Sequence, residues 1–379
     1  MRIFGFLFLG LLTLAGARAA DALRIPAPPE LGLRAYLLVD FDSGKVLAES
    51  NADERIEPAS LTKILTVYTV AEALRSGRIK LTDSTVVSEY AWRQEGSRMF
   101  LDVNKPVTVD ELLHGDIIQS GNDASVALAE HVAGTEEAFA EAMNANAKAI
   151  GMANSHFKNS TGLPDPEHYT TARDLALLAA ALVRNFPEIY AYFKLPEYTY
   201  NNIHQPNRNG LLGKDPTVDG IKTGHTESAG YCLVASAKRD GMRLISVVLG
   251  AKSNSERTRA SQALLNYGFH FYETRQLYAA NASVTKAPVW LGEVPQVEIG
   301  VGETPVIITF PRGQYDKMKA NVDLPARLDA PIEKGKALGA VHVKLDGKPL
   351  AEVPLVALQA VPEGSFFSRM IDRVRLMLN

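Results

Sequence analysis

The sequence predicts a mixed α/β (α+β) fold in which helices flank an antiparallel sheet, followed by a smaller all-β domain. Three observations predict it. The segment from Ser60 to Leu74 is apolar on nearly every face, which is typical of a buried helix. Beyond Gly220, strand patterns with hairpin signals replace the helical patterns. From Val289 to Ala360 the chain reads as short strands and turns, which indicates a second domain.

The first residues are typical of a cleaved leader. Arg2 precedes the apolar run Ile3–Leu14, and Ala17-Arg18-Ala19 has the small residues of a cleavage site, so residues 1–19 are expected to be a signal peptide. The apolar run is shorter than the ~20 residues of a membrane span. Removing the leader takes two arginines and no acid, which changes the net charge from −3 to −5. An acidic body argues against nucleic-acid binding.

The next segments predict a hairpin and then helices. Ala35–Asp40 and Lys45–Ala48 flank the turn residues Asp42-Ser43-Gly44. Thr108-Val109-Asp110-Glu111 is a capping box, which predicts that a helix begins there. Amphipathic patterns predict further helices at two segments, Ala124–Ile150 and Leu175–Asn185.

Strands and one helix complete the large domain, which we expect at residues 30–275, with the all-β domain at 276–362. The strand patterns lie at 221–224, 230–237 and 242–250. A helix is predicted at Ser261–Tyr272, and Asp240-Gly241 and Asp346-Gly347 are hairpin signals. The single cysteine, Cys232, falls in an apolar strand, so a buried inert thiol is favoured over a nucleophile.

Three short motifs carry the candidate chemistry. Ser60-Leu61-Thr62-Lys63 places a serine and a lysine on one face of the buried helix, where the amine reaches the hydroxyl. A buried lysine loses its charge readily and can act as a general base. The same pattern at Ser155–Lys158 and Ser283–Lys286 stands in polar or strand-like surroundings and is interpreted as surface. The chain also has one Ser-x-Asn, Ser120-Gly121-Asn122, and one Lys-Thr-Gly, Lys222-Thr223-Gly224.

In this order the motifs resemble those of the penicilloyl-serine transferase superfamily, the serine D,D-peptidases and serine β-lactamases. From Leu33 to about Met377 the chain resembles the D-alanyl-D-alanine carboxypeptidases of the penicillin-binding protein 5/6 type. The segments that carry this resemblance are Ile118–Ala124, Asn207–Leu212, Val218–Thr226 and Leu265–Phe269. The resemblance implies a β-lactamase/transpeptidase-like catalytic domain, no cofactor, peptidoglycan stem peptides ending in D-Ala-D-Ala as substrates, and β-lactams as covalent inhibitors.

The implied reaction gives each motif residue a role. Ser60 is expected to attack the carbonyl between two D-alanines, and Lys63 to accept the serine proton. Ser120 is expected to relay a proton to the leaving amine, and Asn122 to hold the substrate amide. Lys222 adds a second positive charge, which is expected to lower the pKa of Lys63.

Five further positions are expected to bind substrate. The family's arrangement implies that the N–H groups of the nucleophilic serine and of His225 stabilise the oxyanion. Gly224 leaves room for an extended peptide along the strand edge. Thr223 and Arg257 are candidates for the substrate's terminal carboxylate, the alternative for Arg257 being a solvated surface charge. Arg208 is a further candidate, with a structural salt bridge as its alternative.

Three other function classes fit the sequence less well. The eight histidines are scattered without a His-Glu-x-x-His motif, so no metal site is expected. A serine β-lactamase shares the three motifs, but the Glu-x-x-Leu-Asn segment of class A deacylation is absent. A non-catalytic wall-binding scaffold is the third possibility, and the intact motif residues argue against it.

The C-terminal segment Ser365–Leu378 is predicted to be an amphipathic helix. Its apolar residues fall on one arc, and Arg369, Arg373 and Arg375 outnumber Asp372. A basic amphipathic helix on an acidic protein suits the headgroup region of an anionic membrane. The alternative is a helix packed on the β domain. With the leader, this predicts a periplasmic protein on the outer face of the inner membrane.

Overall fold

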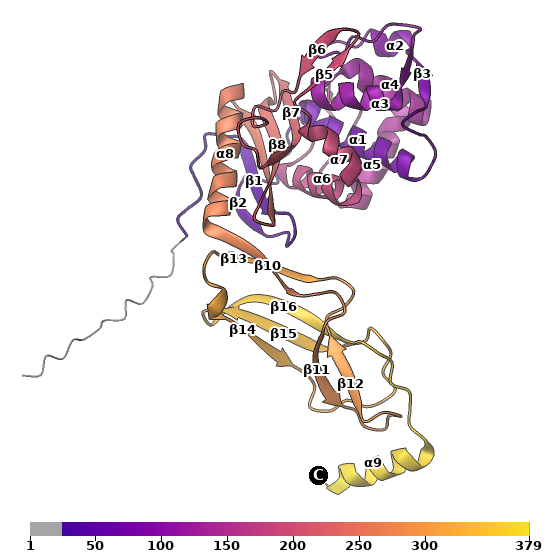
Figure 1. The fold of residues 1–379 in the computed structure, drawn as a ribbon, viewed down its shortest axis with the longest axis vertical. Helices are drawn as coiled ribbons and strands as arrows, with labels where there is room; N and C mark the ends of the chain where they lie inside the picture. The colour runs from indigo at the N-terminus through magenta and orange to yellow at the C-terminus, as the bar shows by residue number, and fades with distance from the viewer. Residues whose placement is uncertain (1–24, 379) are drawn as a thin grey trace, which may run out of the picture.

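The computed structural model describes residues 25–378, so the leader predicted at 1–19 lies outside the described residues. Figure 1 shows a larger α/β part, a smaller part made of strands, and a last helix at the end farthest from the α/β part. The mixed fold predicted from the sequence is confirmed. Two hydrophobic cores lie on the two sides of the sheet in the α/β part, and a third fills the smaller part.

A five-stranded antiparallel sheet is the centre of the α/β part, with the strand order β2-β1-β9-β8-β7. Its strands are β1 (Ala35–Asp40), β2 (Val46–Ser50), β7 (Val218–Thr226), β8 (Gly230–Arg239) and β9 (Met242–Ala251). Asp240 and Gly241 both take positive φ, as the predicted tight hairpin requires. Because β7 is an edge strand, one of its sides is available to a ligand.

Helices cover both faces of this sheet. They are α1 (Thr62–Arg75), α2 (Glu89–Trp92), α3 (Val109–His114), α4 (Asn122–Ala133), α5 (Glu136–Ile150), α6 (Ala172–Asn185), α7 (Pro187–Tyr190) and α8 (Asn254–Phe271). Helix α8 packs on β8 and β9, and α6 packs on the other face (Figure 1). Two small hairpins complete this part, β3 (Ser84–Val86) with β4 (Pro106–Thr108) and β5 (Glu197–Tyr200) with β6 (Ile203–Pro206).

Most predicted helices are present, with two differences. The capping box is confirmed, because the Thr108 side chain accepts from the Glu111 N–H at the start of α3. The amphipathic segment predicted at Ala124–Ile150 is helical but is divided into two helices, because α4 ends before Gly134, whose φ is +85°, and α5 starts at Glu136. Helix α8 begins at Asn254 rather than at 261, since its first turns are polar and lack the periodicity that predicts a helix.

The smaller part contains a five-stranded antiparallel sheet with the order β11-β12-β16-β15-β14. Its strands are β11 (Ser283–Pro288), β12 (Gln296–Gly300), β14 (Met318–Asp323), β15 (Ala337–Leu345) and β16 (Lys348–Ala357). Strand β10 (Tyr272–Tyr278) continues directly from α8 and pairs with β13 (Val306–Pro311). The predicted hairpin at Asp346-Gly347 joins β15 to β16.

The chain passes from the larger part to the smaller part where α8 continues into β10, and hydrogen bonds also join the two parts. Ser43, in the turn between β1 and β2, contacts the Thr309 hydroxyl at 2.6 Å. Lys45 Nζ donates to the Thr309 carbonyl at 3.0 Å. Arg312 Nη2 donates to the carbonyl of Phe269 near the end of α8 at 2.9 Å. The junction is therefore held at several separate points.

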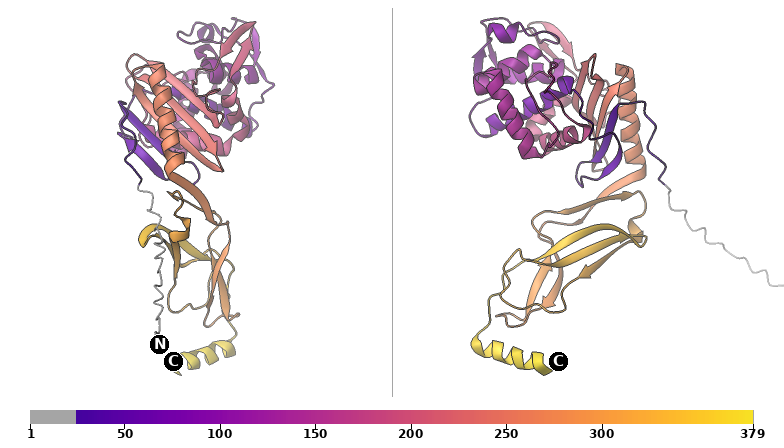
Figure 2. Two further views of the ribbon diagram at one scale, coloured as in Figure 1. Left: turned by 60° about the vertical axis from the view of Figure 1, so that its left-hand side comes forward. Right: turned by 180° about the vertical axis from the view of Figure 1, so that it is seen from behind.

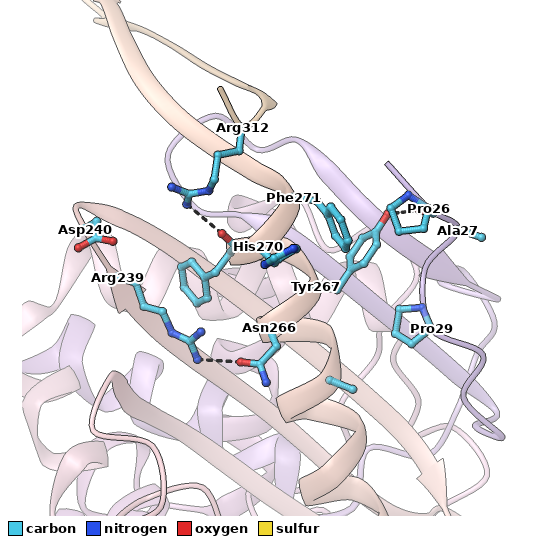
Figure 3. Close-up of a pocket in the computed structure, with 12 residues that line it drawn as sticks. Pro26, Ala27, Pro29, Arg239, Asp240, Asn266, Tyr267, His270, Phe271 and Arg312 are labelled. Carbon is cyan, nitrogen blue, oxygen red and sulfur yellow. Dashed lines mark hydrogen bonds between the residues drawn. The ribbon is translucent and has the colours of Figure 1, made fainter. Parts of the chain in front are cut away.

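A hollow of about 680 Å³ lies at this junction and contains none of the three motifs (Figure 3). It is lined by the N-terminal segment, the β8–β9 turn and the second half of α8. Its polar groups largely bond one another: Tyr267 donates to the Pro26 carbonyl at 3.1 Å, and Arg239 to Asn266 Oδ1 at 3.1 Å. We interpret it as a packing feature of the junction.

The chain ends in α9 (Phe366–Leu378), which lies beyond the smaller sheet in each view (Figure 2). Its apolar side chains are at least half exposed, so they do not pack on the β domain: Phe366, Phe367, Met370, Ile371, Val374 and Met377. Asp372 ties the helix to the body by accepting from the Leu291 N–H at 3.0 Å. Within residues 25–378, no helix is both long and apolar enough to cross a bilayer.

Candidate active site

The three motifs, far apart in the sequence, meet at one cleft of about 180 Å³. Ser60 comes from the short 3₁₀ turn before α1, Ser120 from the turn before α4, Asn122 from the first residue of α4, and the third motif from edge strand β7. The predicted residues that line the cleft are Ser60, Ser120, Asn122, Arg208, Thr223, Gly224, His225 and Arg257. Lys63 and Lys222 lie buried behind this wall.

Two glycines allow other segments to approach the nucleophile. Ala59, beside Ser60, has φ +49°, a conformation that is uncommon for a residue with a Cβ. A Cβ on Gly162 would lie 1.8 Å from the Ala59 carbonyl oxygen, and one on Gly224 would lie 2.9 Å from the Pro58 carbonyl oxygen. Gly224 therefore lets β7 pack against the turn that carries Ser60, in addition to the expected role of leaving room for substrate.

Lys63 is positioned by two strong acceptors. Its Nζ donates to Asn122 Oδ1 at 2.7 Å and to the Thr161 carbonyl at 2.6 Å. The same nitrogen lies 3.4 Å from Ser60 Oγ, as the three-residue spacing predicted. A neutral amine has two hydrogens and one lone pair. With both hydrogens donated, the lone pair remains for the serine.

Burial favours the neutral form of Lys63. Desolvation lowers its pKa to about 8, with a further lowering by Arg208, while Asp116 and Asp123 act in the opposite direction. Lys222 was expected to be the lysine that lowers this pKa. In the structure, burial is the largest cause of the lowered pKa of Lys63. The repulsion between the two lysines is most evident on Lys222, whose own pKa is lowered by burial and then by Lys63.

The second motif occupies a sharp turn. Ser120 has φ +66°, and its hydroxyl is buried without a hydrogen-bond partner among the described residues. Asn122 accepts from Lys63 and donates one amide hydrogen to the Glu95 carbonyl at 2.5 Å. Its second amide hydrogen has no such acceptor within residues 25–378. The free Ser120 hydroxyl and this amide hydrogen are the groups that a substrate can engage.

Asp123 fixes this turn, a role that sequence reasoning did not assign. Its carboxylate accepts three backbone N–H groups, those of Met99, Phe100 and Leu101, at 2.8, 3.0 and 3.1 Å. A Cβ on Gly121 would lie 2.8 Å from the Asp123 carboxylate, which explains the glycine between the two motif residues. The sequence feature that could have indicated this role is the acidic residue directly after the Ser-x-Asn motif.

Asp116 is a second residue that sequence reasoning missed. It lies on a π-helical turn, Gly115–Gln119, and is fully buried. Ser125 donates to one carboxylate oxygen, and the other has no partner among the described residues. Burial raises the pKa of Asp116 to about 6, against the lowering effect of Lys63. A buried carboxylate with a raised pKa therefore acts electrostatically on the lysine base.

Edge strand β7 and helix α8 form the other wall. Arg257 is buried rather than solvated, so the alternative of a surface charge is wrong. Its Nη1 donates to the carbonyls of Gly224 and Cys232 at 3.0 and 3.2 Å, and its Nε donates to Asn254. The His225 ring lies against Tyr231, with a centroid distance of 4.0 Å. Arg257 lines the cleft, and its remaining nitrogen, Nη2, has no hydrogen-bond acceptor among the described residues.

Arg208 projects from the segment between β6 and β7. Its Nη2 donates to Ser97 Oγ at 2.8 Å, and it makes no ion pair with any described carboxylate. The structural salt bridge that was its alternative is therefore absent from the described part of the chain. Desolvation lowers the pKa of Arg208. The residue adds positive charge to the end of the cleft where Arg257 also lies.

The loop from Asn159 to Leu163 closes the cleft and was not predicted as part of the site. Asn159 Oδ1 accepts from the N–H groups of Thr161 and Gly162 at 3.2 and 2.7 Å, which folds the loop so that the Thr161 carbonyl meets Lys63. Buried Glu136 holds it from below by accepting from the Ser160 N–H at 2.9 Å. No carboxylate lines the cleft among the described residues.

Cys232 lies on β8, opposite Gly224 of β7, and is fully buried, and burial raises the pKa of its thiol to about 11. The expected burial of this thiol is confirmed. Of the other two Ser-x-x-Lys patterns, neither contributes to the cleft. Within the described residues, no three metal-ligating side chains come together.

The comparisons with known proteins agree with this geometry. The family model described as D-alanyl-D-alanine carboxypeptidase matches residues 23–253, and that of the penicillin-binding protein 5 C-terminal domain matches 272–363. The chain belongs to the D-alanyl-D-alanine carboxypeptidase family. It is accordingly a serine peptidase and a hydrolase, as the resemblance implied.

Among curated relatives, the D-alanyl-D-alanine carboxypeptidase DacC of Escherichia coli is 46% identical over 92% of this chain and 89% of the relative. Penicillin-binding protein 5 from Haemophilus influenzae superposes with a TM-score of 0.87 at 42% identity, covering 89% of this chain and 100% of the other. Penicillin-binding protein D2 from Listeria monocytogenes, in its ampicillin-bound form, gives 0.59 at 30% identity over 64% of this chain and 100% of the other.

Proposed function

We propose that the carboxypeptidase reaction runs through an acyl-enzyme on Ser60 and removes the terminal D-alanine from peptidoglycan stem peptides. The environment of Lys63 is the observation that carries this assignment. Two acceptors take the hydrogens of its amine, and the same nitrogen, Nζ, lies 3.4 Å from Ser60 Oγ. A neutral lysine in this arrangement can only accept a proton from the serine.

In the first step, Ser60 Oγ forms a bond to the carbonyl carbon of the penultimate D-alanine while its proton passes to Lys63. The carbonyl electron pair moves onto oxygen, where the N–H groups of Ser60 and His225 stabilise the charge. The C–N bond then breaks, its electron pair stays on the leaving nitrogen, and Ser120 relays the proton from Lys63 to that nitrogen. Water hydrolyses the ester and restores Ser60.

The charges of the cleft select a substrate with a free C-terminus. Thr223, Arg257 and Arg208 line one cleft, and the first two are the groups that we propose to receive the terminal carboxylate. The free Nη2 of Arg257 supplies a charge-assisted hydrogen bond, which is about twice as strong as a neutral one. An amidated or extended C-terminus forfeits this interaction, which is the behaviour of a carboxypeptidase.

A serine β-lactamase is the second candidate, because it forms the same acyl-enzyme. It must then hydrolyse that ester quickly with an activated water. The cleft shows no carboxylate among its described lining residues that could serve as that base. We therefore expect β-lactams to form a long-lived adduct on Ser60 and to act as inhibitors.

One experiment separates the candidate functions. Purified protein is incubated with benzylpenicillin and followed by intact mass, and in parallel D-alanine release from a stem pentapeptide is measured. An adduct that is lost in Ser60→Ala, together with D-alanine release, supports the proposal. Rapid penicillin turnover without D-alanine release indicates a β-lactamase. Absence of both adduct and product contradicts catalysis by this cleft.

A membrane surface is the partner that we propose for α9. Six apolar side chains of this helix are at least half exposed, and the arginines Arg369, Arg373 and Arg375 flank them. The arginine stems can extend along the apolar face while their charged ends contact lipid headgroups. With the expected leader, this places the protein in the periplasm, on the outer face of the inner membrane.

Vesicle sedimentation tests this placement. The mature protein should pellet with vesicles that contain anionic lipid, less so at high salt, and a deletion of residues 363–379 should stay in the supernatant. The replacement Ile371→Glu puts a charge in the apolar face and should weaken binding in the intact chain. Pelleting of the deleted form to the same extent as the intact chain would contradict the anchor.

A further inference from the structure

A second pocket adjoins the catalytic cleft beyond Asn122. It has a volume of about 480 Å³ and is lined by Glu89, Tyr90, Arg93, Gln94, Glu95 and Leu163. Leu163 lines the cleft and this pocket alike, and Gly96, the neighbour of Glu95, also lines the cleft. The pocket lies where α2 faces the loop from Asn159 to Leu163. It is thus a continuation of the cleft.

The direction of a bound substrate leads into this pocket. The terminal carboxylate belongs at Thr223 and Arg257, and Asn122 holds the amide on the acyl side of the scissile bond. The chain therefore leaves the cleft past Asn122, whose amide already donates to the Glu95 carbonyl at 2.5 Å. One residue advances an extended chain by ~3.4 Å. The residue before D-Ala-D-Ala is then the one whose side chain enters the pocket.

The charged side chains that line the pocket include one more acid than base. Arg93 pairs with Glu89 at 2.5 Å, which neutralises both. Glu95 is exposed, and its carboxylate makes no hydrogen bond or ion pair within residues 25–378. One negative charge without a partner among the described residues therefore lines the pocket. A cationic group is the ligand that this charge favours.

Leu163, which also lines the cleft, and the Tyr90 ring give the pocket apolar surface. Leu163 is 36% exposed and Tyr90 is 52% exposed, with its hydroxyl turned away to Glu136 at 2.7 Å. Exposed apolar faces of this kind cover the methylene groups of a long side chain. The pocket thus combines an apolar and an aromatic side chain with an unpaired carboxylate. An aliphatic stem with a terminal ammonium matches both.

We propose that this pocket is the subsite for the residue preceding D-Ala-D-Ala, and that Glu95 holds the terminal ammonium of an aliphatic side chain at that position. The inference rests on the proposed function, because it takes its substrate direction from the peptidase reaction. It makes Glu95 a specificity-determining residue for diamino-acid stem peptides. Arg93 modulates the site by neutralising Glu89.

Three peptides test the subsite on the full-length mature protein: acyl-lysyl-D-Ala-D-Ala, its Nε-acetyl derivative and its norleucine analogue. D-alanine release should be about three- to tenfold more efficient, in kcat/KM, with the free ammonium than with either uncharged peptide. In Glu95→Gln, the lysyl peptide should fall to the level of the norleucine peptide. In Arg93→Gln, Glu89 loses its ion-pair partner and adds a second negative charge to the pocket, so the preference for the lysyl peptide should increase.

Controls separate the failure of this subsite from failure of the proposed function. Glu141→Gln, a matched change at an exposed glutamate of α5, should keep the preference for the lysyl peptide. Adduct formation with benzylpenicillin shows independently whether Ser60 is reactive in each variant. Equal turnover of all three peptides, or a preference that survives in Glu95→Gln, overturns the subsite alone. No D-alanine release from any peptide overturns the function on which it rests.

Discussion

Replacing Asp116 with asparagine should shift the pH dependence of acylation to lower pH. The carboxylate is buried beside the lysine base, and its negative charge raises the pKa of both Lys63 and Lys222. Asparagine has nearly the same shape and still accepts the hydrogen bond of Ser125. The change therefore removes charge with little change in packing, and the pKa of Lys63 should fall.

The size of the effect follows from the pKa of Lys63, which is about 8. A neighbouring opposite charge changes a pKa by ~1–3 units, so the smallest expected shift brings Lys63 to a pKa of about 7. At pH 7 the neutral fraction then rises from about one tenth to about one half, a gain of roughly fivefold. Asp116 itself has a pKa of about 6, so below pH 5 it is protonated in the parent protein as well. The two proteins should converge there, and again above pH 9.

The assay is the second-order rate constant for acylation by benzylpenicillin, measured by intact mass from pH 5 to pH 9. Glu141→Gln supplies a carboxylate-to-amide control at an exposed site outside the cleft. The difference between the acylation rate constants of the variant and the parent protein should be largest near pH 7 and should vanish at pH 5 and pH 9. An acidic limb that stays in place or moves to higher pH would refute the electrostatic account of Asp116 and Lys63.

Three further outcomes are expected. Gly162→Ala should lower the melting temperature and the acylation rate together, because its Cβ would overlap the Ala59 carbonyl, whereas Gly213→Ala, with open space around it, should affect stability less. The pKa of buried His168 is lowered to about 4 from 6.5, so its neutral form is favoured by folding; stability should be complete above pH 6.5 and decline toward pH 4, and thermal melts of His168→Gln should show a weaker decline. Arg257→Lys replaces the planar fork by a point charge and should raise KM for the peptide about tenfold with a smaller change in kcat, which steady-state kinetics measure.

Much of the catalytic centre could be predicted because local pattern and spacing carry it. Ser60 and Lys63 share a helix face, so their proximity follows from helix geometry alone. The hairpin at Asp240-Gly241 and the capping box at Thr108 are likewise local, and both are present. The convergence of the three motifs is not local, and it was accessible only through the resemblance.

The rest of the site depends on contacts that no sequence pattern announces. The Thr161 carbonyl meets Lys63 because Asn159 folds its own loop, and Glu136 supports that loop from another helix. The burial of Asp116 is a property of how α3 and α4 pack, since an acid on a helix is usually exposed. Arg257 was placed by sequence reasoning outside any helix, because the polar first turns of α8 hid its start.

The bonds from Ser43 and Lys45 to Thr309 have a consequence for the cell wall. Because hydrogen bonds join the two parts at several points, the distance from the cleft to α9 is set by the protein itself. If α9 lies on a lipid surface, as we propose, the enzyme would trim stems only within a limited range of distances from the membrane. Newly made strands near the membrane and older strands farther out would then differ in how many terminal D-alanines they retain.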